Sequence, residues 1–148
     1  MERVRVAEDA LDAGALLSTF LAHVGDAGGV TSFAGQVRGG TTHTLTLTRL
    51  EPLTTREITE AVDATIARFD LVDAVVRHRV GPMAVGETIV FVATAAPHRR
   101  AAFEACDYLM DYLKTRAVFW KQESGMDGAN WIEPREQDYA DATRWSDI

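Results

Sequence analysis

Two lysines stand out in this 148-residue chain, because thirteen of its fifteen lysines and arginines are arginine. Lys114 and Lys121 lie seven positions apart in one short segment. Arginine stays protonated at any working pH, whereas a partly desolvated lysine can lose its proton and act as a nucleophile or as a general acid or base. The pattern predicts chemistry that requires an amine. The alternative is chance in a biased composition, with Lys114 merely pairing with Asp111 on one helix face.

Whether the two lysine side chains point to the same place depends on the secondary structure of the segment that carries them. A seven-residue step is about two turns of an α-helix, so a helix that continues through Lys121 would point both ammonium groups the same way. If the helix ends near Ala117, Lys121 reaches the site from a loop.

A second candidate is Pro97-His98-Arg99-Arg100, which follows an apolar run and opens a helix. Helix N-termini present free N–H groups and a positive dipole end, so a His-Arg pair there is a natural receptor for phosphate or carboxylate. The alternative is a solvated helix start. Arg38 enters the Gly39-Gly40 loop from a strand and can be aimed at a neighbouring pocket. Arg135, after Trp131-Ile132-Glu133-Pro134, is a further candidate.

The histidines and the cysteine do not indicate a metal site. His23, His43 and His78 show no metal-ligand spacing with one another or with Cys106, so we expect solvated or core histidines, no bound metal and no cofactor. The single cysteine excludes an internal disulfide and lies among apolar residues, where a buried and inert thiol is expected. The sequence also has no P-loop, dinucleotide fingerprint or nucleophile elbow.

Composition narrows the function classes. The formal net charge of −7 argues against a nucleic-acid surface, although a local basic cluster could still bind a small anion. The N-terminus has no secretion signal, and no stretch approaches the roughly 18 apolar residues of a membrane span, so we expect a cytoplasmic protein. The length fits a single domain over residues 1–148.

Periodicity predicts an α+β chain. Apolar stripes indicate helices at 13–24 and 56–69, a heavily buried helix from Pro97 onward and a terminal helix at 136–145. Strands are expected in five places: 30–37, 44–50, 74–80, 88–95 and 131–133. The almost unbroken apolar run at 88–95 predicts a central strand. Residues 38–43 and 81–86 are expected to be a loop and a turn, and residues 123–130 a mobile loop.

The segment 103–123 closely resembles the signature of the molybdopterin synthase large-subunit family. In that family a Met-Asp-Tyr-Leu-Lys-Thr-Arg-Ala-x-Phe-Trp-Lys string carries both active-site lysines, and here the string occupies residues 110–121. The resemblance extends from about residue 28 to 145. Further matching segments are Phe33-Ala34-Gly35-Gln36-Val37-Arg38, Val80-Gly81, Gly86-Glu87, Ile89-Val90-Phe91-Val92, His98-Arg99, Ala102-Phe103 and Trp131-Ile132-Glu133 before Arg135.

This resemblance implies a sulfurtransferase with an α/β-hammerhead-like fold, in which helices pack on a mixed or antiparallel sheet. It implies a homodimer in which each subunit binds a small ubiquitin-like sulfur carrier, making a heterotetramer. The carrier's C-terminal Gly-Gly thiocarboxylate would thread into a pocket. Two carriers in succession would deliver the two sulfurs that convert cyclic pyranopterin monophosphate into the dithiolene of molybdopterin.

The resemblance also implies residue roles. Lys114 would lie beside the thiocarboxylate tail and Lys121 beside the pterin. Four residues would hold the phosphate and pterin, with some contributed across the dimer: Arg38, His98, Arg99 and Arg135. Segments 39–42 and 48–52 depart from the family pattern. The alternative function is a non-catalytic small-ligand or partner-docking domain of the same fold, against which the intact lysine pair and His-Arg element argue.

Overall fold

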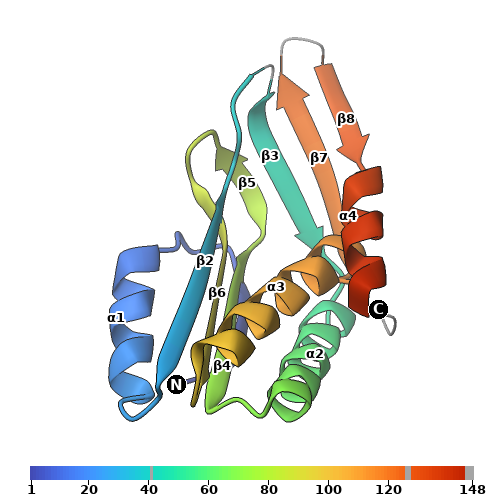
Figure 1. The fold of residues 1–148 in the computed structure, drawn as a ribbon. Coiled ribbons are helices and arrows are strands. Elements are labelled where there is room, and N and C mark those ends of the chain that lie inside the picture. Colours follow the sequence, from blue (N-terminus) through green and yellow to red (C-terminus); the bar gives the residue numbers. More distant parts are fainter. Residues whose placement is uncertain (41, 126–127, 146–148) are drawn as a thin grey trace.

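The computed structural model describes residues 1–40, 42–125 and 128–145, whose strands and helices form an α+β fold (Figure 1). In chain order the elements are β1 Val4–Ala7, α1 Ala13–His23, β2 Gly29–Gln36, β3 Thr42–Arg49, α2 Leu53–Phe69, β4 Asp73–Arg79, β5 Gly81–Ala84, β6 Thr88–Ala96, α3 Arg99–Thr115, β7 Phe119–Gly125, β8 Gly128–Ile132, α4 Glu136–Ala142 and the 3-10 helix η1 Thr143–Trp145. None of the helices in this described part has the length and apolar character needed to span a bilayer.

The strands form two sheets rather than one. The first has the order β1-β4-β6-β2 and is mixed, because β1 runs parallel to β4 while the other pairs are antiparallel. The second has the order β5-β3-β7-β8 and is antiparallel throughout. The expected α+β class is confirmed, and the apolar strand β6 lies inside its sheet, as its sequence predicts.

Helices cover both faces of the first sheet (Figure 1). On one face α1 buries Phe20 against Phe91 of β6. On the other face α2 and α3 contribute Ile58 and Leu109 to a larger core, which continues to Leu47 of the second sheet. All five side chains are at most 1% exposed. Since burying such a side chain is worth about 1.5–3 kcal/mol, this shared core fixes the two sheets relative to each other.

Two expectations about connecting segments were wrong. The predicted turn at 81–86 begins with β5, which pairs with β3 at the edge of the second sheet, the place in a sheet where a proline such as Pro82 is tolerated. The predicted mobile loop at 123–130 is largely a β hairpin, in which Glu123 pairs with Leu45 of β3. Residues 126 and 127 of that segment, and residue 41 of the predicted 38–43 loop, lie outside the described residues.

A buried carboxylate joins the C-terminal segment to α3. Oδ2 of Asp111 accepts hydrogen bonds from Nη2 of Arg144 at 2.7 Å and from Nε1 of Trp145 at 2.6 Å. The Trp145 ring also packs edge-to-face on Tyr108 and Phe69. These contacts fix α4, which precedes them in the chain and forms part of the cavity described below.

We expect Asp111→Ala to lower the free energy of unfolding by about 2 kcal/mol, because it leaves the Trp145 indole N–H and the Arg144 guanidinium without their shared acceptor. For a chain of this size that corresponds to a melting temperature about 4–8 °C lower. Asp107→Ala is the control, since Asp107 also pairs with Arg144 but is 53% exposed and should contribute less than about 1 kcal/mol. Thermal unfolding of both variants measures the difference, and equal shifts would contradict this account.

Candidate active site

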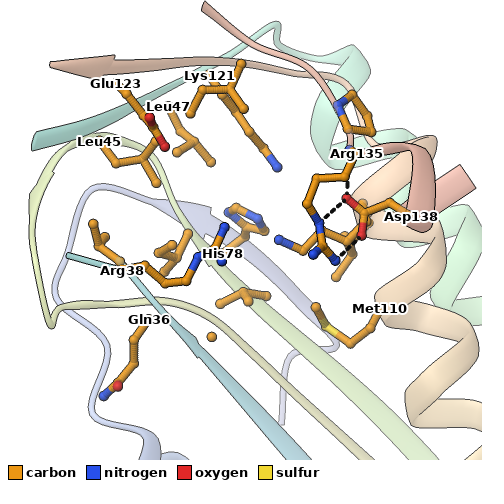
Figure 2. A pocket seen from close by; sticks show the side chains of 18 of the residues that line it. Gln36, Arg38, Leu45, Leu47, His78, Met110, Lys121, Glu123, Arg135 and Asp138 are labelled. Atoms are coloured by element: carbon orange, nitrogen blue, oxygen red, sulfur yellow. Dashed lines mark hydrogen bonds and ion pairs between the residues drawn. The ribbon is translucent and has the colours of Figure 1, made fainter. Parts of the chain in front are cut away.

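A cavity of about 480 Å³ opens between the two sheets beside the C-terminal end of α3 (Figure 2). Strands of both sheets, the last turn of α3 and the first turn of α4 form its wall. Its volume lies in the range typical of small-molecule sites. The charged residues that line it are Arg38, Lys114, Lys121, Glu123, Glu133, Arg135 and Asp138.

Lys114 stands in the last turn of α3, where a positive charge is favoured by the negative end of the helix dipole. The helix ends at Thr115, and the N–H groups of Arg116 and Ala117 both bond to the carbonyl oxygen of Tyr112. The helix therefore does not continue to the second lysine.

Lys121 comes from β7, an inner strand of the second sheet, and not from a loop as the sequence suggested for a broken helix. Alternation along the strand sends Trp120 outward, where it is 59% exposed, while the Lys121 side chain points into the cavity (Figure 2). Burial, together with the charge of Lys114, lowers the pKa of Lys121 to about 8, while Asp138 opposes the shift. This amine is therefore still mostly protonated near physiological pH, but it releases its proton far more readily than an ordinary lysine.

Arg38 follows β2 at the mouth of the cavity. The preceding residue, Val37, is buried, and its N–H and carbonyl bond to the backbone of Glu87 and Gly86. This double anchor fixes the backbone immediately before Arg38, whose side chain is exposed.

Arg135 caps the N-terminus of α4 and is held by Asp138. Its Nη2 and Nε donate to the two oxygens of Asp138 at 3.0 and 3.4 Å, and its backbone N–H donates at 3.0 Å. Burial alone would raise the pKa of Asp138, but the hydrogen bonds from Arg135 outweigh it and the net shift is downward. Asp138 therefore stays ionised and fixes Arg135 at the cavity wall.

The other three cations of the cavity have no protein partner in the described part of the chain. Arg38, Lys114 and Lys121 form neither a hydrogen bond nor an ion pair with any described residue. Four cations and three carboxylates line the cavity, and among the described residues only Asp138 of these carboxylates bonds to one of the cations, Arg135. An anionic ligand could therefore form charge-assisted hydrogen bonds with the three cations that lack a partner. The cavity thus has the character of an anion-binding site in an otherwise acidic protein.

Comparison with known proteins decides the family: the family model described as MoaE protein matches residues 6–116. The chain belongs to the MoaE family. It is 49% identical over 144 residues to the molybdopterin synthase catalytic subunit of Caulobacter vibrioides, and the match covers 96% of each chain. The expected resemblance is confirmed, and family membership makes this MoaE chain a sulfurtransferase of molybdenum cofactor biosynthesis.

Solved structures agree with the fold of this MoaE chain. The molybdopterin biosynthesis MoaE protein from Burkholderia ambifaria matches with a TM-score of 0.85 and 33% identity, covering 100% of both chains. A chain in the complex of subunits 1 and 2 of the Helicobacter pylori molybdopterin-converting factor matches with a TM-score of 0.75. Its identity is 19%, over 90% of this chain and 91% of the other, so this second likeness is one of fold.

The predicted pair His98 and Arg99 does not line the cavity of this MoaE chain. It lies at the N-terminus of α3, and the fifteen residues from there to Lys114 span about 22 Å of helix. Both side chains are exposed. The backbone just before α3 packs closely on the turn between α1 and β2, where a Cβ at Gly28 would lie 1.9 Å from the Pro97 carbonyl oxygen. Within one chain, His98 and Arg99 are therefore separate from the cations that line the cavity.

His78 also lines the cavity of this MoaE chain, although its position in the sequence does not mark it as a site residue. It is one of four polar or charged residues in the seven-residue strand β4, and the sequence predicted it only as a solvated or core histidine. Cys106 is buried as predicted, and burial raises the pKa of its thiol to about 12, so it is inert. Among the described residues no three ligating side chains gather as a metal site would require.

Proposed function

We propose that this chain transfers sulfur from the thiocarboxylated C-terminus of a small ubiquitin-like carrier to cyclic pyranopterin monophosphate, in two rounds that produce the molybdopterin dithiolene. The observation that carries the proposal is the set of unpaired cations around one cavity of about 480 Å³. Both reactants are anions, since one has a phosphate and the other a thiocarboxylate. A local positive site in a chain of net charge −7 is what selective binding of such anions requires.

The two lysines have different roles in this proposal. Lys114 lies at the end of α3 and receives the carrier's thiocarboxylate, whereas Lys121 faces the pterin from β7. Sulfur transfer and opening of the cyclic phosphate both move protons, and the lowered pKa of Lys121 suits an amine that gives up and regains a proton at neutral pH. Arg38 and Arg135 hold the phosphate and the pterin as fixed charges.

A second copy of the chain supplies His98 and Arg99 to the site. Their distance along α3 from Lys114 supports this arrangement, because no motion within one chain that preserves the helix brings them to the same cavity. Phe103, one turn further along the same helix, is 61% exposed. A large exposed apolar side chain beside unpaired charges is a common feature of contact surfaces.

The carrier is the second proposed partner, giving a heterotetramer of two chains and two carriers. The Helicobacter pylori structure named as a complex of subunits 1 and 2 supports a partner subunit, because one of its chains shares this fold. Trp120 and Trp131, in edge-to-face contact with ring centroids 5.8 Å apart, are 59% and 63% exposed and offer an apolar docking surface. We place the reaction in the cytoplasm.

Reconstitution tests the proposal directly. Purified protein is mixed with its thiocarboxylated carrier and cyclic pyranopterin monophosphate, and the dithiolene product is measured after conversion to a fluorescent derivative. We expect product in proportion to the carrier, with two carriers consumed for each molybdopterin. Omitting the carrier, or supplying it with a plain carboxylate terminus, is the control. If the complete mixture yields no product while the carrier still binds, the chain is a partner-docking domain of the same fold.

A further inference from the structure

His78 connects the two sheets at the cavity. It lies on β4 of the first sheet, and its ring stacks on Phe119 of β7 in the second sheet, with centroids 4.2 Å apart. The side chain is only 6% exposed, yet it lines the cavity (Figure 2). Because Phe119 precedes Lys121 by two positions on the same strand face, the His78 ring lies next to the amine-bearing part of the wall.

Hydrogen bonding fixes which ring nitrogen of His78 is available. Nδ1 lies 2.9 Å from the carbonyl oxygen of Arg79, and a carbonyl oxygen only accepts, so Nδ1 carries the hydrogen. In a neutral ring Nε2 then has a free lone pair. Nε2 has no hydrogen-bond partner among the described residues, and no buried side-chain nitrogen or oxygen of that part is unsatisfied. Nε2 must therefore border the cavity.

The surroundings keep this ring neutral. Burial lowers the pKa of His78 to about 4, with the bond to Arg79 opposing the shift and the charges of Lys121 and Lys114 adding to it. The charged groups around the same cavity are Arg38, Lys114, Lys121, Glu123, Glu133, Arg135 and Asp138. Among the carboxylates, Asp138 already accepts hydrogen bonds from Arg135, while Glu123 and Glu133 are further acceptors, but charged ones.

The cations of the cavity only donate hydrogen bonds. They can hold the anionic part of a ligand, but an N–H or O–H group on the same ligand needs an acceptor, and a donor buried without one costs free energy. Nε2 of His78 is an acceptor of fixed orientation, because stacking on Phe119 and the bond to Arg79 hold the ring on two sides. Nε2 can therefore accept a hydrogen bond from an N–H or O–H group of a ligand whose anionic part is held by the cations of the cavity.

We propose that His78 is a substrate-binding residue whose Nε2 accepts a hydrogen bond from an N–H or O–H group of the pterin-type substrate while Arg38 and Arg135 hold its phosphate. The inference rests on the proposed function and extends it. It makes His78 a determinant of specificity, since an anion that lacks the donor gains nothing from it.

The test compares two ligands by calorimetric titration: cyclic pyranopterin monophosphate, which carries N–H and O–H donors, and sulfate, which is a fully ionised anion without a donor. His78→Phe keeps the ring stack and removes the acceptor. We expect the affinity of H78F for the pterin phosphate to fall about ten-fold, while its affinity for sulfate stays within about two-fold of wild type. His78→Gln, whose amide oxygen can accept, should recover part of the lost affinity.

Equal loss for both ligands would show that His78 only maintains the cavity, and no loss for either would show that Nε2 is unused. Both results overturn the inference. A reduced turnover with unchanged pterin affinity would overturn it as well, because His78 would then act by positioning Lys121 and not by binding the substrate. If thermal unfolding shows that H78F is not folded, His78→Met replaces it in the same comparison. If wild-type protein binds sulfate but not the pterin phosphate, the proposed substrate is wrong and the inference fails with it.

Discussion

Lys121→Arg should reduce molybdopterin formation by at least about 100-fold, although it preserves the charge, because proton transfer by a positioned group contributes about 10²–10⁴-fold. The arginine side chain cannot release a proton in this pH range, whereas the pKa of Lys121 is lowered to about 8 by burial and by Lys114. Lys114→Arg tests in the same way whether its amine is required. In wild type, the rate should change with a midpoint near pH 8, and K121R should lack that midpoint.

The measurement is single-turnover product formation across pH 6–10 with saturating carrier. Arg56→Lys is the matched control, because it also exchanges arginine and lysine, but at an exposed position on α2 outside the cavity. We expect this variant to keep the wild-type rate. Wild-type rates in both lysine variants would mean that charge suffices. In that case the unpaired amines serve only to bind anions, and the proton-transfer account is wrong.

The second large effect concerns the shared site. Arg99→Ala and Lys121→Arg homodimers should each be nearly inactive, the first because it loses a charge-assisted contact to phosphate. A purified heterodimer with one substitution in each chain should recover about half of the wild-type activity, because one of its two sites receives an intact cavity from one chain and an intact Arg99 from the other.

The reciprocal heterodimer supplies the control. It combines a wild-type chain with a chain that carries both substitutions. With shared sites each of its two sites is damaged once, so it should be inactive. If each chain instead builds its own site, this heterodimer keeps one intact site, and the one with divided substitutions keeps none. Opposite activities in the two heterodimers thus decide whether Arg99 acts across a dimer.

The sequence predicted helices where the buried side chains recur with the period of an α-helix. In α2, Ile58 and Val62 lie one turn apart and both are fully buried, as the stripe predicted. The four-residue strands β1 and β5 are too short to show a repeat, and their partners, not their residues, fix their register. The hairpin of β7 and β8 appeared to be a loop because one face of β7 borders a cavity, where polar residues such as Glu123 replace the apolar ones of a core strand.

The candidate site was readable in part. Choice of lysine over arginine marked Lys114 and Lys121, which do meet at one cavity together with Arg38 and Arg135. The His-Arg pair opens α3 as the sequence predicted, but at the opposite end of that helix from Lys114, so its expected place beside the lysines is not met within one chain. His78 was indistinguishable from an ordinary core histidine, because its role depends on a cavity that only the packing of two sheets creates.

The most direct test is a titration of the lysine amines themselves. The chain contains only two lysines, so protein labelled with ¹³C-lysine gives two side-chain signals, and K121R assigns them. We predict that the Lys121 signal titrates with a pKa near 8, and that sulfate, by placing an anion beside the amine, raises that value. A Lys121 signal that titrates near the usual lysine pKa of about 10.4, with or without sulfate, would contradict the account.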